Sequence, residues 1–134
     1  MKLSILLFAL LVSSVGCNRG PVLVPVTGEV TFNGKPVVPG AVFIEPDGGP
    51  DGTVQRASGL LQLDGSFALR TYPHGDGAMP GKYRLYLQLG HGTKPELAAF
   101  TDVTRSPLMV IVPDAGLEDH RIELADYIKG QPRR

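Results

Sequence analysis

Glycine and proline punctuate this chain along nearly its whole length and divide it into short segments. The 134 residues include 17 glycines and 12 prolines, and no long stretch shows the periodicity of a helix. Short apolar segments bounded by turn-forming residues are typical of strands. We therefore predict an all-β domain. A single cysteine excludes an intrachain disulfide, so the core alone must stabilise this domain.

The clearest strand is predicted at residues 82–89, where apolar and polar side chains alternate with the period of a half-buried strand. Similar patterns predict strands at 26–32, 41–45, 53–63, 108–112 and 120–124, and a return strand that carries Phe67 and Leu69. About seven strands at this spacing favour a β-sandwich. Its core is expected to contain Val30, Phe32, Phe67, Leu69, Tyr83, Leu85, Leu87, Ile122 and Leu124.

Turn-forming pairs separate the predicted strands. Asn33-Gly34 is a strong hairpin signal because both residues tolerate positive φ, and Asp64-Gly65 repeats the pattern. Gly59, inside a predicted strand, indicates a bulge or the close approach of another backbone. The segment 96–100 fits either a short strand or a single helical turn.

The N-terminal segment has the layout of a secretory signal, with Lys2 before an apolar run at 3–12 and small residues before Cys17. The run is too short for a membrane-spanning helix, which needs about 20 apolar residues. The domain organisation that we expect is a signal peptide at 1–16, a tether at 17–25, a β-sandwich at 26–126 and a polar tail at 127–134.

Cys17, with Gly16 before it, resembles the lipobox of bacterial lipoproteins, with Ser14 in place of the usual leucine. The resemblance implies that the Cys17 thiol carries diacylglycerol. The partner of this residue would then be the lipid of a bacterial membrane, facing the periplasm or the exterior. Asn18 rather than aspartate follows the cysteine, which favours the outer membrane. The alternative is an ordinary signal peptide cut near Cys17.

Charge argues against some classes of partner. The formal net charge is zero, and acidic and basic residues are interspersed along the chain. No basic patch indicates nucleic-acid binding. Attachment to a membrane would therefore come from lipid rather than from charge.

The loop at 72–77 gathers the candidate ligand contacts Tyr72, His74 and Asp76. Glycines there would let a ligand approach the backbone closely. The same composition is typical of a turn. The segment 75–81 holds three glycines that permit positive φ and a proline that fixes the backbone where the next strand begins. We favour the interpretation as a fold-setting loop over that as a binding site.

The sequence predicts no metal, cofactor or catalytic residue. The paired spacing of a zinc site is absent among His74, His91 and His120. The Asp-x-Asp ladder of a calcium loop is absent among Asp47, Asp51, Asp64 and Asp76. No Gly-x-Ser-x-Gly elbow indicates a nucleophilic serine.

The order of motifs resembles the small exported lipoproteins of planctomycete bacteria that are described as transthyretin-like or carboxypeptidase-regulatory-like domains. The resemblance covers about residues 24–125 and rests on Val26-Thr27-Gly28-Glu29-Val30, Asn33-Gly34-Lys35-Pro36, Asp64-Gly65-Ser66-Phe67 and the stretch at 75–83. It implies a Greek-key β-sandwich of about seven strands, also called prealbumin-like, and no activity. Hydroxyisourate hydrolases of this fold end in Tyr-Arg-Gly-Ser, whereas this chain ends in Gln131-Pro132-Arg133-Arg134.

The function that we expect is that of a non-enzymatic envelope lipoprotein, whose β-sandwich binds or supports an envelope protein or polysaccharide. The alternative is a small carbohydrate-binding domain or a hydrolase that uses the loop at 72–76. Tyr86 and Arg84, on the outward face of the strand at 82–89, are candidates for a flat sugar-stacking surface. A partly buried His74 beside Asp76 in a deep pocket would favour the alternative.

Overall fold

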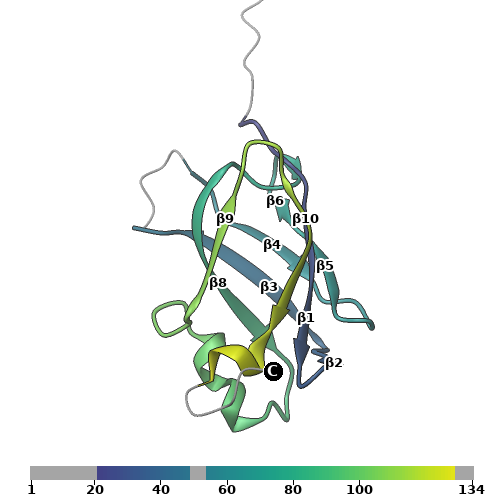
Figure 1. The fold of residues 1–134 in the computed structure, drawn as a ribbon. Helices are drawn as coiled ribbons and strands as arrows, with labels where there is room; N and C mark the ends of the chain where they lie inside the picture. Colours follow the sequence, from purple (N-terminus) through teal and green to yellow (C-terminus); the bar gives the residue numbers. More distant parts are fainter. Residues whose placement is uncertain (1–20, 49–53, 129–134) are drawn as a thin grey trace, which may run out of the picture.

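The computed structural model describes residues 21–48 and 54–128. Within them lie ten strands and two 3-10 helices (Figure 1). The strands are β1 (Val26–Phe32), β2 (Lys35–Pro36), β3 (Gly40–Pro46), β4 (Ala57–Leu60), β5 (Ser66–Ala68), β6 (Arg70–Thr71), β7 (Gly75–Asp76), β8 (Gly81–Leu89), β9 (Leu108–Val112) and β10 (Leu117–Glu123). The 3-10 helices are η1 (Pro95–Thr101) and η2 (Leu124–Tyr127).

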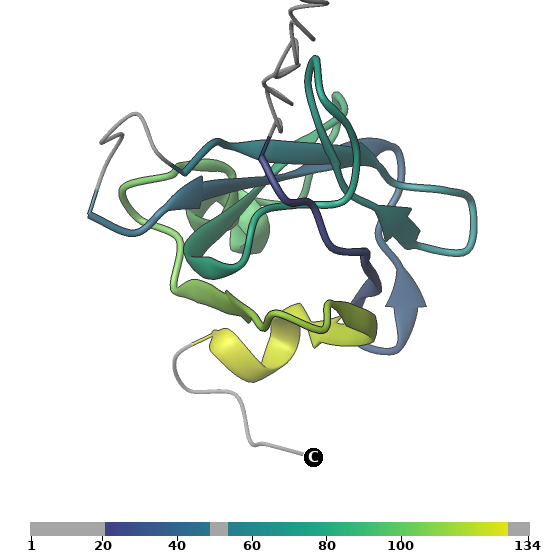
Figure 2. The same cartoon turned by 90° about the horizontal axis from the view of Figure 1, so that it is seen from above.

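The strands form two sheets, which Figure 2 shows as two layers. The larger sheet has the order β7-β6-β4-β3-β8-β9, and its pairs are antiparallel. In the smaller sheet, β1 pairs with β10 in parallel and with β2 and β5 in antiparallel fashion. This arrangement confirms the predicted all-β sandwich. The Greek-key connection stays a prediction. The two-residue strands β2, β6 and β7 raise the number of strands above the seven expected from sequence patterns.

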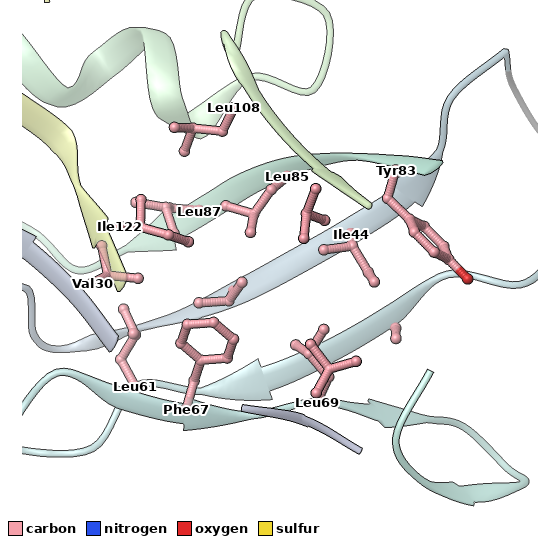
Figure 3. Packing of buried hydrophobic residues seen from close by; sticks show 14 of the residues in the cluster. Val30, Ile44, Leu61, Phe67, Leu69, Tyr83, Leu85, Leu87, Leu108 and Ile122 are labelled. Atoms are coloured by element: carbon pink, nitrogen blue, oxygen red, sulfur yellow. The ribbon is translucent and has the colours of Figure 1, made fainter. Parts of the chain in front are cut away.

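The core lies between the two sheets (Figure 3). Of the predicted core residues, all are buried except Phe32, which is partly buried and packs against the cluster. The predicted alternation of β8 is confirmed, since Tyr83, Leu85 and Leu87 are at most 2% exposed while the residues between them are not buried. The period-two pattern therefore identified both the strand and the face that it buries.

The predicted turns form as expected. Asn33 and Gly34 hold φ of +51° and +77° between β1 and β2. At Gly59 a Cβ atom would lie 2.3 Å from the carbonyl oxygen of Ala68, so this glycine marks a close approach of two backbones.

The undecided segment at 96–100 belongs to η1, a 3-10 helix with a proline at its start.

The structure corrects several predicted boundaries. The strand predicted at 53–63 is shorter, because the chain turns after Leu61: the Gly65 N–H donates to the Gln62 carbonyl, and Leu63 is 91% exposed. The last strand ends at Glu123, since Leu124 begins η2.

The sandwich also extends beyond the predicted limits of 26 and 126. Val24, assigned to the tether by sequence, is buried and forms a bridge with Ala78. Ile128 is partly buried and packs against the core.

Candidate functional site

The three candidate ligand contacts lie on the hairpin between β6 and β7, at one edge of the larger sheet. Tyr72 is 84% exposed, and His74 and Asp76 are exposed as well. The stem of the hairpin is buried: the Thr71 side chain is fully buried, and its hydroxyl donates to the Gly77 carbonyl at 2.9 Å. The stem therefore holds the exposed tip in place.

The base of this hairpin packs against the backbone of Val24. Val24 and Ala78 exchange two backbone hydrogen bonds of 2.9 Å. A Cβ atom on Gly77 would lie only 2.4 Å from the Val24 carbonyl oxygen, and Gly77 holds φ of +99°. These contacts support the fold-setting interpretation for the base of the loop.

A row of side chains crosses the outer face of the larger sheet. The cross-strand partners in this row are Asp76, Arg70, Ser58, Phe43 and Tyr86. They share the outer face because the residues that flank Phe43 in β3 point into the core. The row crosses five adjacent strands, or about 19 Å at the usual strand spacing. In Figure 1 this face is turned away from the viewer, since β1 and β10 lie in front.

Two aromatic rings stack near one end of this row. The centroids of the Phe43 and Tyr86 rings are 5.3 Å apart, and their planes differ by 17°. The Tyr86 hydroxyl donates to a Glu45 carboxylate oxygen at 3.4 Å, and the same oxygen lies 3.6 Å from the Arg56 guanidinium. Burial raises the pKa of the Tyr86 hydroxyl, and the negative charge of Glu45 raises it further. The phenol therefore stays neutral at physiological pH.

An open hollow of about 560 Å³ lies on the β4 side of the ring pair, and we call it the β4 hollow. Its lining includes two aromatic rings and four polar side chains: Phe43, Tyr72, Ser58, Arg70, Asp76 and Gln88. Of the three candidate contacts, Tyr72 and Asp76 line this hollow and His74 does not. The structure thus joins part of the predicted loop to the outer face of the sheet.

A second hollow of about 470 Å³ lies on the other side of the ring pair, between β8 and η1, and we call it the η1 hollow. Tyr86 and Lys94 line it, and it shares Phe43 and Gln88 with the β4 hollow. The two hollows therefore form one continuous surface that crosses the aromatic pair.

Arg84, a candidate for the flat surface at the sequence level, has another role. Its guanidinium donates to the carbonyl oxygens of Val103 and Thr104 at 3.4 and 3.1 Å. The side chain therefore fastens the segment after η1 to β8.

Two of the four acidic residues considered for calcium, Asp47 and Asp64, are held by local contacts. The Asp64 carboxylate accepts hydrogen bonds from the Ser66 hydroxyl and N–H, which lower its pKa. Asp47 lies 3.5 Å from the Lys82 ammonium, and Asp51 is outside the described residues. In the part of the chain that the structure describes, no three His, Cys, Asp or Glu side chains gather as metal ligands would.

The predicted lipidation site, Cys17, lies outside the described residues, as do the predicted signal peptide and most of the predicted polar tail. Between residues 21 and 48 and between 54 and 128, no helix is long and apolar enough to cross a membrane.

Comparisons with protein-family models, with curated proteins and with solved structures find no match to this chain. The transthyretin-like resemblance therefore stays a prediction.

Phe43, the central residue of this face, was not among the site residues predicted from the sequence. The sequence does contain one indication of its role. Phe43 stands between Val42 and Ile44, which point into the core, so an aromatic side chain lies on the outward face of this strand. Arg70 gave no such signal, because β6 is only two residues long. Its place in the row depends on the register with Ser58.

Proposed function

We propose that this protein is an exported lipoprotein, anchored to a bacterial membrane through Cys17, that binds a cell-envelope component through the outer face of its larger sheet. The observation that supports binding is the Phe43–Tyr86 stack with a hollow on each side. Aromatic rings beside polar groups are enriched where proteins bind partners, because they offer apolar area and hydrogen bonds together. The resemblance to exported lipoproteins supports the location of this function in the envelope.

We propose a binding role without catalysis. A hydrolase at the loop would need His74 beside Asp76 in an enclosed pocket, where burial and a carboxylate neighbour tune an imidazole as a general base. His74 is exposed instead, and the β4 hollow is open and lined without it. This geometry favours a binding surface over a hydrolytic site.

The anchor and the binding face would work close together. Val24 is the first buried residue of the sandwich in the part that the structure describes, and only residues 18–23 separate it from Cys17. A fully extended link of this length spans at most about 25 Å. The proposed partner is therefore a component that lies near the membrane surface, with the outer membrane as the favoured location.

Replacing Cys17 with serine is expected to abolish lipid labelling and to release the protein from membranes. Diacylglycerol is attached through a thioether at the cysteine sulfur, and serine has no sulfur to form this bond. The acyl chains that are lost contribute about 0.8 kcal/mol of membrane affinity per buried methylene. Cells fed a clickable fatty acid provide the measurement, with membrane and soluble fractions compared for wild type and Cys17→Ser. Wild-type protein that is unlabelled and soluble would contradict the anchor.

Binding through the outer face is a separate claim and has a separate test. A photo-crosslinking residue placed in the face captures what touches it in cells, and the same residue on the smaller sheet serves as the control. The crosslinking experiment remains valid even if the wild-type protein carries no lipid, because an unlipidated protein can still be exported.

A further inference from the structure

We infer that the β4 hollow is a binding site for an uncharged polysaccharide chain, with Phe43 and Tyr72 as stacking platforms and Arg70 and Asp76 as the hydrogen-bonding pair. This inference rests on the proposed function, because it names the class of ligand for the same face. It differs from the earlier alternative of a loop site, since the sheet supplies most of the contacts and His74 supplies none.

The aromatic faces in the hollow suit the apolar side of a sugar ring. One face of the Phe43 ring stacks on Tyr86, its partner in β8. The other face of the Phe43 ring is directed toward β4, where Phe43 lines the hollow. Tyr72 is 84% exposed and lines the same hollow from the hairpin. Two rings on opposite sides of a shallow hollow offer apolar surface at low conformational cost. The C–H face of a pyranose is the kind of ligand that such rings bind.

The polar side chains supply both kinds of hydrogen-bonding group that sugar hydroxyls need. The Arg70 guanidinium is a donor, the Asp76 carboxylate is an acceptor, and Ser58 and Gln88 are both. These four side chains make no hydrogen bond or ion pair with another side chain in the described residues. Their capacity is therefore available to a ligand.

The charges in the hollow favour an uncharged ligand. Among the described residues that line the hollow, Arg70 and Asp76 are the only ionisable ones besides Tyr72, and they are cross-strand partners in β6 and β7. Within the β4 hollow one positive and one negative charge cancel, so neither a polyanion nor a polycation gains a net attraction there. The ammonium of Lys94, which lines the η1 hollow, lies 5.4 Å from the centroid of the Phe32 ring. A chain of neutral sugars can instead use each charged group as a strong single hydrogen-bonding partner.

The shape of the surface favours a chain over a single sugar. The row from Asp76 to Tyr86 is about 19 Å long at ordinary strand spacing. Beyond the ring pair it continues into the η1 hollow, which shares Phe43 and Gln88. A polysaccharide can therefore extend from one hollow across the aromatic pair into the other.

Affinity electrophoresis of the full-length protein in detergent tests this inference. Native gels contain dextran, mannan, soluble starch or hydroxyethyl cellulose as neutral probes, and alginate or chitosan as charged ones. We expect at least one neutral polysaccharide to retard the protein and its effect to exceed that of both charged polymers. Phe43→Ala and Tyr72→Ala should each weaken the apparent Kd about tenfold, a size typical of a lost aromatic platform.

Two further variants separate stacking from a general loss of structure. Asp76→Asn keeps the shape of the side chain but removes its charge and is expected to weaken retardation severalfold. Arg121→Ala, on the outer face of the smaller sheet, should bind as wild type does. Melting temperatures close to that of wild type show that the Phe43, Tyr72 and Asp76 variants are folded.

Three outcomes would overturn the inference: no retardation by any neutral polysaccharide, stronger retardation by a charged polymer, or equal retardation of Phe43→Ala and wild type. If the sugar gels fail but a photo-crosslinker in the outer face still captures an envelope protein, the ligand class is wrong and the proposed function stands. If neither the sugar gels nor the photo-crosslinker in the outer face detects a ligand, both the ligand class and the proposed function are wrong.

Discussion

Leu85→Ala is expected to destabilise the sandwich by about 2–5 kcal/mol, the range for large-to-small changes in a packed core. Leu85 is 2% exposed and lies between Ile44 of β3 and Leu108 of β9 in the register of the larger sheet. Truncation removes apolar contacts and leaves a cavity between two strands that cannot easily collapse. Urea denaturation gives the free energy of unfolding.

Gln88→Ala is the matched control for this change. It lies on the same strand but on the exposed face, so its effect should stay within about 0.5 kcal/mol. A loss of less than about 1 kcal/mol at Leu85 would show that the inward face of β8 is wrongly assigned.

Gly77→Ala, directly after β7, is expected to destabilise the protein by roughly 2–4 kcal/mol. The new Cβ would lie 2.4 Å from the Val24 carbonyl oxygen, at a residue with φ of +99°. Relief requires the backbone around Val24 to move, which disturbs its two hydrogen bonds with Ala78. Thermal unfolding of the purified protein measures the effect.

Gly75→Ala separates the close contact from the backbone conformation. Gly75 also holds a positive φ, of +140°, but no atom lies within 4 Å of the position of its Cβ. Its substitution should therefore destabilise the protein only through the strain of this backbone conformation, by roughly 1–3 kcal/mol. Equal effects at the two glycines would show that packing against Val24 contributes nothing.

The sequence predicted the elements with strong local signals. The alternation in β8 identified its buried face, because an eight-residue period-two pattern fits no other structure. Asn33-Gly34 predicted a hairpin because few residues other than Asn and Gly adopt positive φ readily. Gly59 indicated either a bulge or a close approach because glycine has no side chain, and the structure shows the close approach.

Features that depend on long-range pairing were not predictable. β1 and β10 pair in parallel although almost the whole domain separates them in sequence, and nothing in either strand indicates that choice. The segment at 96–100 is too short for its pattern to distinguish a strand from a helical turn, and the structure shows it in η1, where Leu97 and Phe100 are buried.

The candidate site was predicted only in part for the same reason. Tyr72 and Asp76 drew attention because unusual residue types gather in a glycine-rich loop. Phe43 and Arg70 enter the site through the register of β3, β4 and β6, which a single sequence does not contain. His74 shares the loop but not the hollow, and only the structure separates it from its neighbours.

The central claim is that the outer face of the larger sheet contacts an envelope component, and crosslinking in cells from defined positions tests it most directly. A diazirine amino acid at Leu60 or at Gln88 lies on the wall of the β4 hollow. The same amino acid at Arg121, exposed on the smaller sheet, is the control. A diazirine inserts into C–H, N–H and O–H bonds, so it captures protein and polysaccharide alike.

Irradiated cells are expected to yield a discrete high-mass adduct from the crosslinker at Leu60 or Gln88 and none from the crosslinker at Arg121. The adduct should disappear when Phe43→Ala is combined with the Leu60 crosslinker. Equal adducts from both sheets, or none from the larger sheet in protein that is exported and folded, would contradict the account.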